Sequence, residues 1–359
     1  MRQGVAVVAA LAFVVGTAAP ARADAVREQQ WFWGPLKVAQ AQKISKGEGI
    51  TVGLLDTGVD GTHPDLKGAV LPGRQVAQDK PSGNLDVNGH GTGMAGVIAG
   101  RGHGSNDGVL GIAPAAKIMP IRPVNDPVLV AQGIRWAVEN GAKVINMSFA
   151  TRDSESLHAA VQEAIAADVV LVATAGNDGD TDNVAEFPGG YPEVLAVGAV
   201  DRNNKVAKFS NHGKHVDLVA PGVEIPGPAP GGKYQRGNGT SGAAAIVAGS
   251  AALIRAEHPE LSATEVMDRL TSTAIDRGDK GRDDYYGVGQ LDLLAALTAE
   301  QPAAKPSQSS KPVETATAPE KAEETGIPPL VIVGAGLVLL LAVGLVVGLL
   351  AARSRRAGG

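Results

Sequence analysis

The chain has 359 residues, of which 44% are hydrophobic and 19% charged, with a formal net charge of −5. This composition excludes a chain that is disordered over most of its length, and the lack of a sustained Lys/Arg block argues against nucleic acid as a partner. Because there is no Cys, the sequence excludes disulfides, thiolate metal sites and cysteine nucleophiles, so any chemistry must use Ser, Thr, carboxylates, His or Lys.

Residues 1–23 predict a secretory signal peptide. A basic start at Arg2 is followed by an apolar run from Val5 to about Ala19 and by the small-x-small sequence Ala21-Arg22-Ala23. We expect cleavage after Ala23. An uncleaved anchor is the alternative, although the run is short for a bilayer span. Under either interpretation the domain that follows is exported.

Residues 24–48 form an N-terminal extension with the aromatic cluster Trp31-Phe32-Trp33. Three exposed aromatic side chains would be costly to leave in water, so we expect the extension to lie strapped across the following domain. The extension is much too short to be a folded propeptide. The sequence leaves open whether it is removed from the mature protein.

Residues 49–299 alternate apolar, β-rich runs with helical stretches and predict one folded domain. We expect strands over 50–56, 117–124, 143–149, 169–175, 194–200 and 216–220. We expect helices over 90–99, 127–139, 155–167, 241–258 and 262–274, the last opened by the capping box Ser262-x-x-Glu265. This alternation predicts an α/β fold of three αβα layers with a mostly parallel central sheet, in which functional groups gather where strands end and helices begin.

The C-terminal part predicts a tether and a membrane anchor. Residues 300–327 are rich in Pro, Ala, Ser, Thr, Glu and Lys and are expected to be a disordered linker. Residues 328–352 contain an uncharged apolar run long enough for a transmembrane helix, and the tail 353–359 is basic. Because basic residues stay on the cytoplasmic side, we expect a single-pass protein of the cell membrane with its folded domain outside and its C-terminus inside.

An acid and an imidazole occur at the ends of predicted elements. Asp56 ends the first strand, where it is positioned to fix a neighbouring imidazole, a turn former or helix cap being the alternative. His90 lies between two glycines at the start of a small-residue helix, which lets backbone and substrate approach it closely. The other histidines lie in loops or on polar helix faces and are expected to be solvated: His63, His103, His158, His212, His215 and His258.

A hydroxyl and an amide occur in similar settings. Ser241 lies in a glycine-rich turn that enters an apolar helix, where backbone N–H groups favour developing negative charge, although a plain N-cap serine would look the same. Asn177 follows an apolar strand, and its amide is free to donate to the oxyanion of an ester or amide cleavage. An ordinary Asn-Asp-Gly turn is the alternative for Asn177.

These four motifs occur in the order Asp, His, Asn, Ser, and together they closely resemble the subtilisin-like serine proteases (subtilases, peptidase family S8). The stretches similar to the family motifs are Asp56-Thr57-Gly58-Val59-Asp60 with His63-Pro64-Asp65-Leu66, His90-Gly91-Thr92, Ala175-Gly176-Asn177 and Gly239-Thr240-Ser241. The chain order of acid, base and nucleophile is also that of subtilisin. The resemblance implies a subtilisin-like fold and a catalytic triad of Asp56, His90 and Ser241. It further implies an oxyanion-hole role for Asn177 and substrate binding by Ser148, Phe149 and Ala150.

The whole architecture is similar to that of the mycosins, membrane-bound subtilases associated with type VII secretion. The signal peptide, the entry segment from Gln30 to Gly49, the linker and the C-terminal helix carry this narrower resemblance. The chain departs from the subtilase pattern after Ser241, where Gly242 to Ile246 replace the common Met-Ala-Ser/Thr-Pro-His, and at Gly93, where a His is common. It also lacks the cysteines that mycosins commonly carry.

The predicted function is an extracytoplasmic serine endopeptidase that cleaves peptide bonds through an acyl-enzyme. Its expected partners are a polypeptide substrate, the lipid bilayer and components of a type VII secretion membrane complex. Two alternatives are a subtilase-fold scaffold that braces such a complex and an esterase, which the absence of a Gly-x-Ser-x-Gly elbow disfavours. We assign no cofactor and no metal; the resemblance alone allows calcium with Asp65 as a ligand, but no Asp-rich calcium loop is visible.

Overall fold

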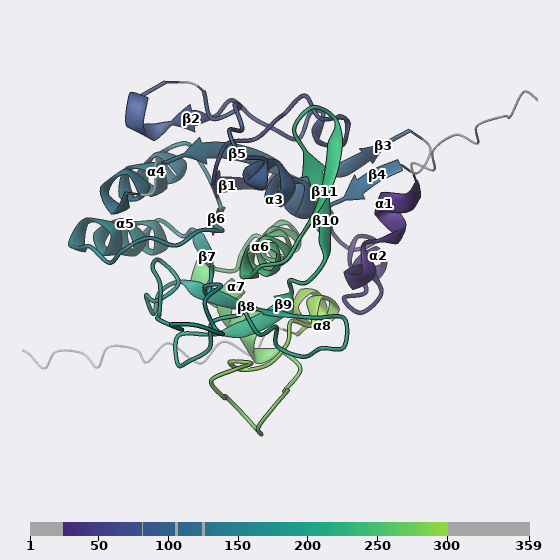
Figure 1. The fold of residues 1–359 in the computed structure, drawn as a ribbon, viewed down its shortest axis with the longest axis vertical. Helices are drawn as coiled ribbons and strands as arrows, with labels where there is room; N and C mark the ends of the chain where they lie inside the picture. The colour runs from purple at the N-terminus through teal and green to yellow at the C-terminus, as the bar shows by residue number, and fades with distance from the viewer. Residues whose placement is uncertain (1–23, 81, 105–106, 124–125, 301–359) are drawn as a thin grey trace, which may run out of the picture. The chain divides into compact units, whose positions relative to one another are not determined.

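The computed structural model describes residues 24–80, 82–104, 107–123 and 126–300. Its centre is a seven-stranded parallel sheet in the order β2-β5-β1-β6-β7-β8-β9 (Figure 1). The strands of this sheet are β1 (Thr51–Leu55), β2 (Arg74–Gln75), β5 (Lys117–Arg122), β6 (Val144–Met147), β7 (Val170–Thr174), β8 (Leu195–Val200) and β9 (Leu218–Pro221). Two antiparallel hairpins complete the described strands: β3 (Arg101–His103) with β4 (Asp107–Leu110), and β10 (Ile225–Ala229) with β11 (Lys233–Gly237).

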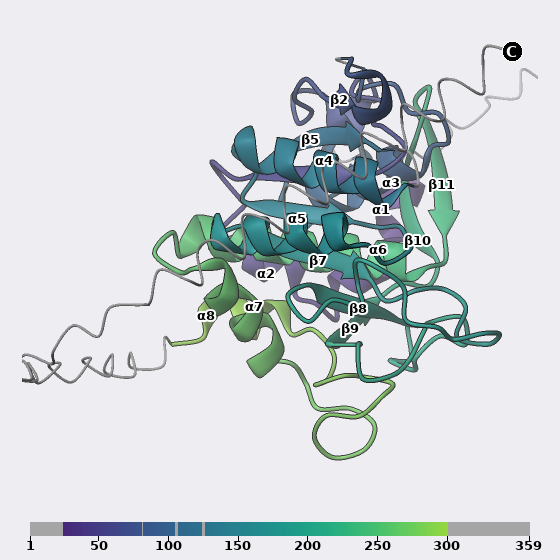
Figure 2. The same cartoon turned by 90° about the vertical axis from the view of Figure 1, so that its left-hand side faces the viewer.

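Helices cover both faces of the sheet. α4 (Pro127–Glu139) and α5 (Glu155–Ala166) pack together on one face, while α3 (His90–Ala99) and α6 (Thr240–Glu257) pack on the other (Figures 1 and 2). On β7, Val170 and Val172 point into the core on the α6 side, and Leu171 and Ala173 point into the core under α4 and α5. Because both faces are covered, these strands are near-continuous apolar runs.

The elements expected from the sequence are confirmed. The six predicted strands correspond to β1 and β5 to β9, and the five predicted helices correspond to α3 to α6 and α7 (Ala263–Ser272), with every end within two residues of its prediction. Helix ends lie where capping side chains place them: Asp126 accepts the Val128 and Leu129 N–H groups before α4, and the capping box of Ser262 opens α7. The α/β fold with a mostly parallel central sheet is therefore as predicted.

The N-terminal extension packs into the domain, as its aromatic cluster predicts. It folds as α1 (Asp24–Glu28), a 3-10 turn over Trp31–Trp33 and α2 (Val38–Ala41). Phe32 is 0% exposed and belongs to the core on the α6 side of the sheet. Gln30 exchanges two hydrogen bonds with the backbone of Leu110 (2.7 and 3.0 Å), and Trp31 Nε1 donates to Val223 O (2.9 Å). The extension is therefore part of the folded domain.

The last described helix is α8 (Leu293–Thr298). Within the described ranges, none of the helices combines the length and the apolar character needed to cross a bilayer. The predicted signal peptide over 1–23, the linker beyond Glu300, the membrane helix over 328–352 and the basic tail over 353–359 lie outside these ranges.

Candidate active site

Asp56 is the first residue after β1, at the carboxyl end of a central strand. Its backbone N–H donates to Ile121 O on β5 (2.9 Å), and its carboxylate accepts the N–H of Thr57 (2.7 Å). The Asp56 side chain is 3% exposed. Strand pairing thus fixes a carboxylate that has little access to water and that needs polar partners within the protein.

His90 begins α3 and is the main partner of this carboxylate. Its Nδ1 lies 2.8 and 3.0 Å from the two Asp56 oxygens. Gly91 lets the helix approach, because a Cβ there would lie 2.1 Å from Gly58 O. Burial lowers the pKa of His90, but the charge and hydrogen bond of Asp56 outweigh burial and raise that pKa above its ordinary value of 6.5. With Nδ1 on the carboxylate, Nε2 is the ring atom free to exchange a proton.

Asp86 orders the loop before His90, and the sequence reasoning missed it. Its carboxylate accepts five hydrogen bonds, from Thr57 Oγ1, from the N–H groups of Asn88 and Gly89, and from both N–H and Oγ1 of Thr92. Burial acts against ionisation, but these hydrogen bonds outweigh it and lower the pKa of Asp86. The available signal was an acid just before Asn88-Gly89-His90, a position typical of loop-ordering Asx turns.

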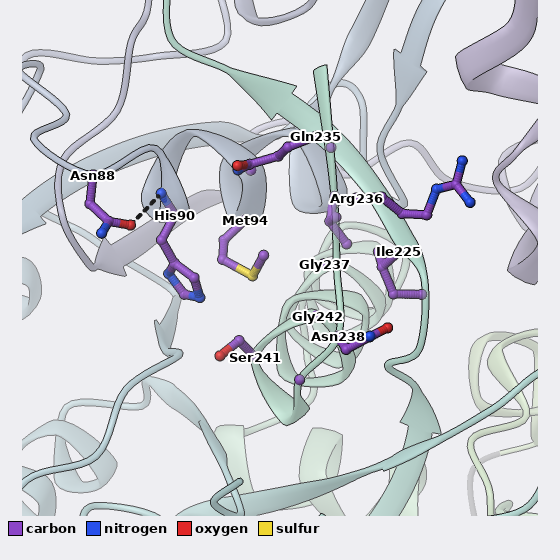
Figure 3. A pocket seen from close by; sticks show the side chains of 14 residues that line it. Asn88, His90, Met94, Ile225, Gln235, Arg236, Gly237, Asn238, Ser241 and Gly242 are labelled. Atoms are coloured by element: carbon purple, nitrogen blue, oxygen red, sulfur yellow. Dashed lines mark hydrogen bonds between the residues drawn. The ribbon is translucent and has the colours of Figure 1, made fainter. Parts of the chain in front are cut away.

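Ser241 lies in the first turn of α6, where the sequence predicts it. It lines a cavity of about 170 Å³ together with His90, Met94 and Gln235. Figure 3 shows the His90 ring and the Ser241 side chain on the same side of this cavity, coming from α3 and α6. The Ser241 hydroxyl donates to Ser148 O (3.2 Å), so in this conformation it is not hydrogen-bonded to the imidazole. Catalytic hydrogen bonds are often loose in a substrate-free site.

Asn177 follows β7 and is anchored to the start of α6. Its Oδ1 accepts the N–H and the Oγ1–H of Thr240 (2.9 and 3.0 Å). Within the described part of the chain, its Nδ2 has no hydrogen-bond partner. A Cβ on Gly239 would lie 3.7 Å from Ser241 N and 3.8 Å from Asn177 Nδ2, so these two donors flank the same spot. Two N–H donors that converge beside a serine hydroxyl can bind a developing oxyanion.

Ser148, Phe149 and Ala150 lie together just beyond the carboxyl end of β6. Ser148 is buried, and its Oγ accepts from Asn146 Nδ2 (2.8 Å) and donates to Ser241 O (3.1 Å). Phe149 lines a second cavity of about 460 Å³, which borders Asp56 and His90. Phe149 and Ala150 are partly exposed, and among the described residues their backbones make no backbone–backbone hydrogen bond. The edge is thus free to pair with an extended peptide.

The prediction that His63 is solvated is wrong. The β10–β11 hairpin covers it, so that it is 1% exposed, and its Nε2 lies 3.0 Å from Lys233 O. Asp65 is also fully buried, and its oxygens accept from His103 Nδ1 (2.6 Å) and Val109 N (2.8 Å). Across the described ranges, no cluster of three or more His, Cys, Asp or Glu has the arrangement of a metal site.

Comparisons with known proteins agree with this geometry. The model of the subtilase family matches residues 47–289. Subtilisin DY of Bacillus licheniformis is 41% identical over 259 residues, which cover 70% of this chain and 92% of that protein. Subtilisin E of Bacillus subtilis (strain 168) is 38% identical over 258 residues, which cover 70% of this chain and 66% of that protein. The crystal structure of MycP1 with its N-terminal propeptide removed superimposes with a TM-score of 0.70 at 32% identity, over 76% of this chain and 98% of the other.

Proposed function

This chain belongs to the subtilase family of serine peptidases, and from that premise we propose that it is a membrane-anchored, extracytoplasmic endopeptidase whose catalytic triad is Asp56, His90 and Ser241. The observation that carries the triad is the 2.8 Å contact between His90 Nδ1 and Asp56, beside a cavity that His90 shares with Ser241. An imidazole held on one side by a buried carboxylate and facing a hydroxyl on the other is what acyl transfer to serine requires.

The reaction begins when the Ser241 hydroxyl rotates from Ser148 O toward the imidazole and attacks the scissile carbonyl, while His90 Nε2 takes its proton. His90 then gives that proton to the leaving amine as the C–N bond breaks, which leaves an acyl ester on Ser241. A water attacks this ester with the same base, and the acid product leaves as the serine hydroxyl is restored. Asp56 accepts the Nδ1–H throughout and stabilises the imidazolium.

Negative charge on the carbonyl oxygen is stabilised by two donors in this mechanism. The Ser241 backbone N–H comes from the start of α6, where the helix dipole also favours an anion. The second donor is Asn177 Nδ2, whose orientation is held because Oδ1 of the same amide accepts from Thr240. Because both donors are in place before the substrate arrives, little reorganisation is needed in the transition state.

Labelling with a fluorophosphonate probe tests the triad directly. The full chain should react at one serine, and Ser241→Ala and His90→Ala should abolish the reaction. Ser272→Ala, at an exposed serine that ends α7, is the matched control and should label like the native protein. Failure of the native protein to label would favour the alternative function, a subtilase-fold scaffold in a membrane complex.

The membrane location rests on the sequence of residues 1–23, 328–352 and 353–359. Cells producing the full chain should retain it in the membrane fraction with its folded domain accessible to external protease. A chain without residues 328–359 should be released to the medium. If the shortened chain stayed in the membrane fraction, or if the domain were protected in intact cells, the proposed topology would be wrong.

An association with type VII secretion is supported by the likeness to MycP1, one structure of which is described as coming from the ESX-1 type VII secretion system, at 30% identity and a TM-score of 0.68. The test is secretion by cells that lack this protein and are complemented with native protein or Ser241→Ala. Restoration by the native protein alone would indicate proteolysis, and equal restoration by both would indicate scaffolding. Restoration by neither would separate this chain from secretion.

A further inference from the structure

Glu186 carries a half-buried carboxylate that the mechanism above does not use. Within the described ranges, no hydrogen bond or ion pair to this carboxylate is formed. Its backbone oxygen accepts from Gly190 N (2.7 Å), so the residue itself is held in a turn. Burial, with a smaller contribution from the charge of Asp178, raises the pKa of Glu186 above its ordinary value. Partial burial of a carboxylate without a hydrogen bond or ion pair costs free energy, which a cationic group from another molecule would offset.

The carboxylate lies directly beside the segment that carries the oxyanion donor. Glu186 Oε2 is 2.8 Å from the position that a Cβ on Gly176 would occupy. Gly176 has a φ of +114°, so only glycine fits there without strain, and its missing side chain leaves room for both the Asn211 amide and the Glu186 carboxylate. Gly176 directly precedes Asn177, whose Nδ2 and the Ser241 N both lie within 4 Å of the position that a Cβ on Gly239 would occupy. The carboxylate therefore lies beside the residue that directly precedes the oxyanion donor in the chain.

The turn that contains Glu186 lies close to both segments that a substrate would contact, Ser148–Ala150 and Gly176–Asn177. The ladder between β6 and β7 ends at the pair Met147 and Ala173. Beyond it, Thr151 pairs instead with Phe187, by hydrogen bonds of 2.7 and 3.3 Å. Phe187 therefore lies beside Thr151, the residue that follows the Ser148–Ala150 segment. Glu186 directly precedes Phe187 in the chain, and its carboxylate reaches Gly176.

An extended peptide on the Ser148–Ala150 edge would place its scissile carbonyl at the donors of Asn177 and Ser241. The residue that supplies this carbonyl, the one before the scissile bond, then projects its side chain beside Gly176 and Glu186. In the described ranges, no Lys or Arg forms an ion pair with this carboxylate, and the neighbouring charge that acts on its pKa, Asp178, is also negative. The unpaired carboxylate is thus placed to meet the side chain of that substrate residue.

We propose that Glu186 is a specificity-determining residue, which selects substrates with Lys or Arg immediately before the scissile bond; this inference rests on the proposed peptidase function. A long cationic side chain would supply the partner that the carboxylate lacks in the free protein. A charge-assisted hydrogen bond in a half-buried site typically changes affinity by roughly ten- to a hundredfold. Subtilase activity alone does not require this preference, because the reacting atoms are those of the triad.

The test uses the full chain in detergent and three fluorogenic peptides that differ only before the scissile bond, with Lys, norleucine or Glu there. Norleucine has nearly the length of Lys without its charge. The native protein should show a kcat/KM ratio of Lys to norleucine of roughly ten to a hundred. Glu186→Gln should bring this ratio close to one, and Glu186→Lys should make the Glu peptide the best of the three. Glu257→Gln, at the far end of α6 from Ser241, is the matched control and should keep the native ratio.

Each ratio is measured within one preparation, so a variant that is partly unfolded still reports it. A native protein that labels with fluorophosphonate but cleaves the norleucine peptide as well as the Lys peptide would overturn the inference and leave the proposed function standing. The same holds if Glu186→Gln keeps the preference for Lys. A native protein that neither labels nor cleaves any peptide would overturn the proposed function itself, and the inference with it.

Discussion

Replacing Asn177 separates catalysis from stability, because the two ends of its amide do different work. Oδ1 accepts the N–H and the hydroxyl of Thr240 at the start of α6, and Nδ2 is the proposed oxyanion donor. Asn177→Ala removes both functions. Asn177→Asp keeps an acceptor for Thr240, but it removes the donor and places a carboxylate where negative charge develops. The two variants should therefore lose similar amounts of activity and different amounts of stability.

The expected magnitudes follow from these contacts. Loss of one preorganised oxyanion donor raises the barrier by about 3 kcal/mol, a magnitude known from subtilisin, a relative of this chain, so kcat should fall roughly a hundred- to a thousandfold in both variants. KM should change little, because the donor acts on the transition state. Asn177→Ala also leaves the buried Thr240 N–H without its acceptor, which should lower the free energy of unfolding by about 1–3 kcal/mol. Asn177→Asp should keep most of that stability.

The measurements are steady-state kinetics on a fluorogenic peptide and urea unfolding of the same preparations. Asn140→Asp makes the same chemical change at the end of α4, where the amide donates to Trp136 O and contacts no catalytic group among the described residues, and should leave kcat within about twofold of native. A stable Asn177→Asp protein with kcat within tenfold of native would refute the oxyanion role. A loss that appears in KM rather than in kcat would also refute it.

Three further predictions concern the pair of Asp56 and His90 and the N-terminal extension. Because His90 must be neutral to act as a base and its pKa is raised, kcat/KM should fall as pH drops through an inflection above 6.5; an inflection below 6.5 would contradict the raised pKa. Asp56→Asn should lower kcat roughly 10⁴-fold. It should also move this inflection to lower pH, because burial lowers the pKa of His90 and the Asp56 charge no longer opposes it. An unmoved inflection in the pH–rate profile would show that another group causes it. Phe32→Ala should lower the free energy of unfolding in urea by about 3–5 kcal/mol, because a fully buried ring is removed, and a loss below 1 kcal/mol would show that the extension is not part of the core.

The sheet and its covering helices could be predicted from the sequence because their signals are local. Strands buried on both faces are continuous apolar runs, as in Val170 to Thr174, and helix ends are marked by capping side chains such as Asp126 and Ser262. Asp56, His90, Asn177 and Ser241 could be proposed as site residues because each lies at the junction of such an element with a glycine-containing turn. Their relative placement follows from the strand order, which the sequence alone does not state.

What escaped prediction depends on contacts between distant segments. His63 was expected in water because it lies in a loop, but the β10–β11 hairpin, some 170 residues away, covers it. The short strands of that hairpin contain Pro226 and Pro228 and have little apolar alternation. Asp86 was missed for a related reason. Its role comes from five hydrogen bonds that the folded loop directs at one carboxylate, and its position just before Asn88-Gly89-His90 was the only local signal in the sequence.

The number of hydrogen-bond partners distinguishes the acids that order this site from the polar groups that remain free to bind a substrate. The Asp86 carboxylate accepts five hydrogen bonds. The Asp65 carboxylate accepts hydrogen bonds from an imidazole and from a backbone N–H. Neither carboxylate therefore has much remaining capacity to accept a hydrogen bond from a ligand. In the described part of the chain, the Asn177 Nδ2 and the Glu186 carboxylate have no such partners, and both lie at the carboxyl end of β7. The Asn177 amide is exposed to solvent and the Glu186 carboxylate is partly buried, so both are accessible to a substrate. Proteins depart from local rules in this way at functional sites, where a substrate supplies the missing contacts. Here it would supply the scissile carbonyl to the donor and a cationic side chain to the acceptor.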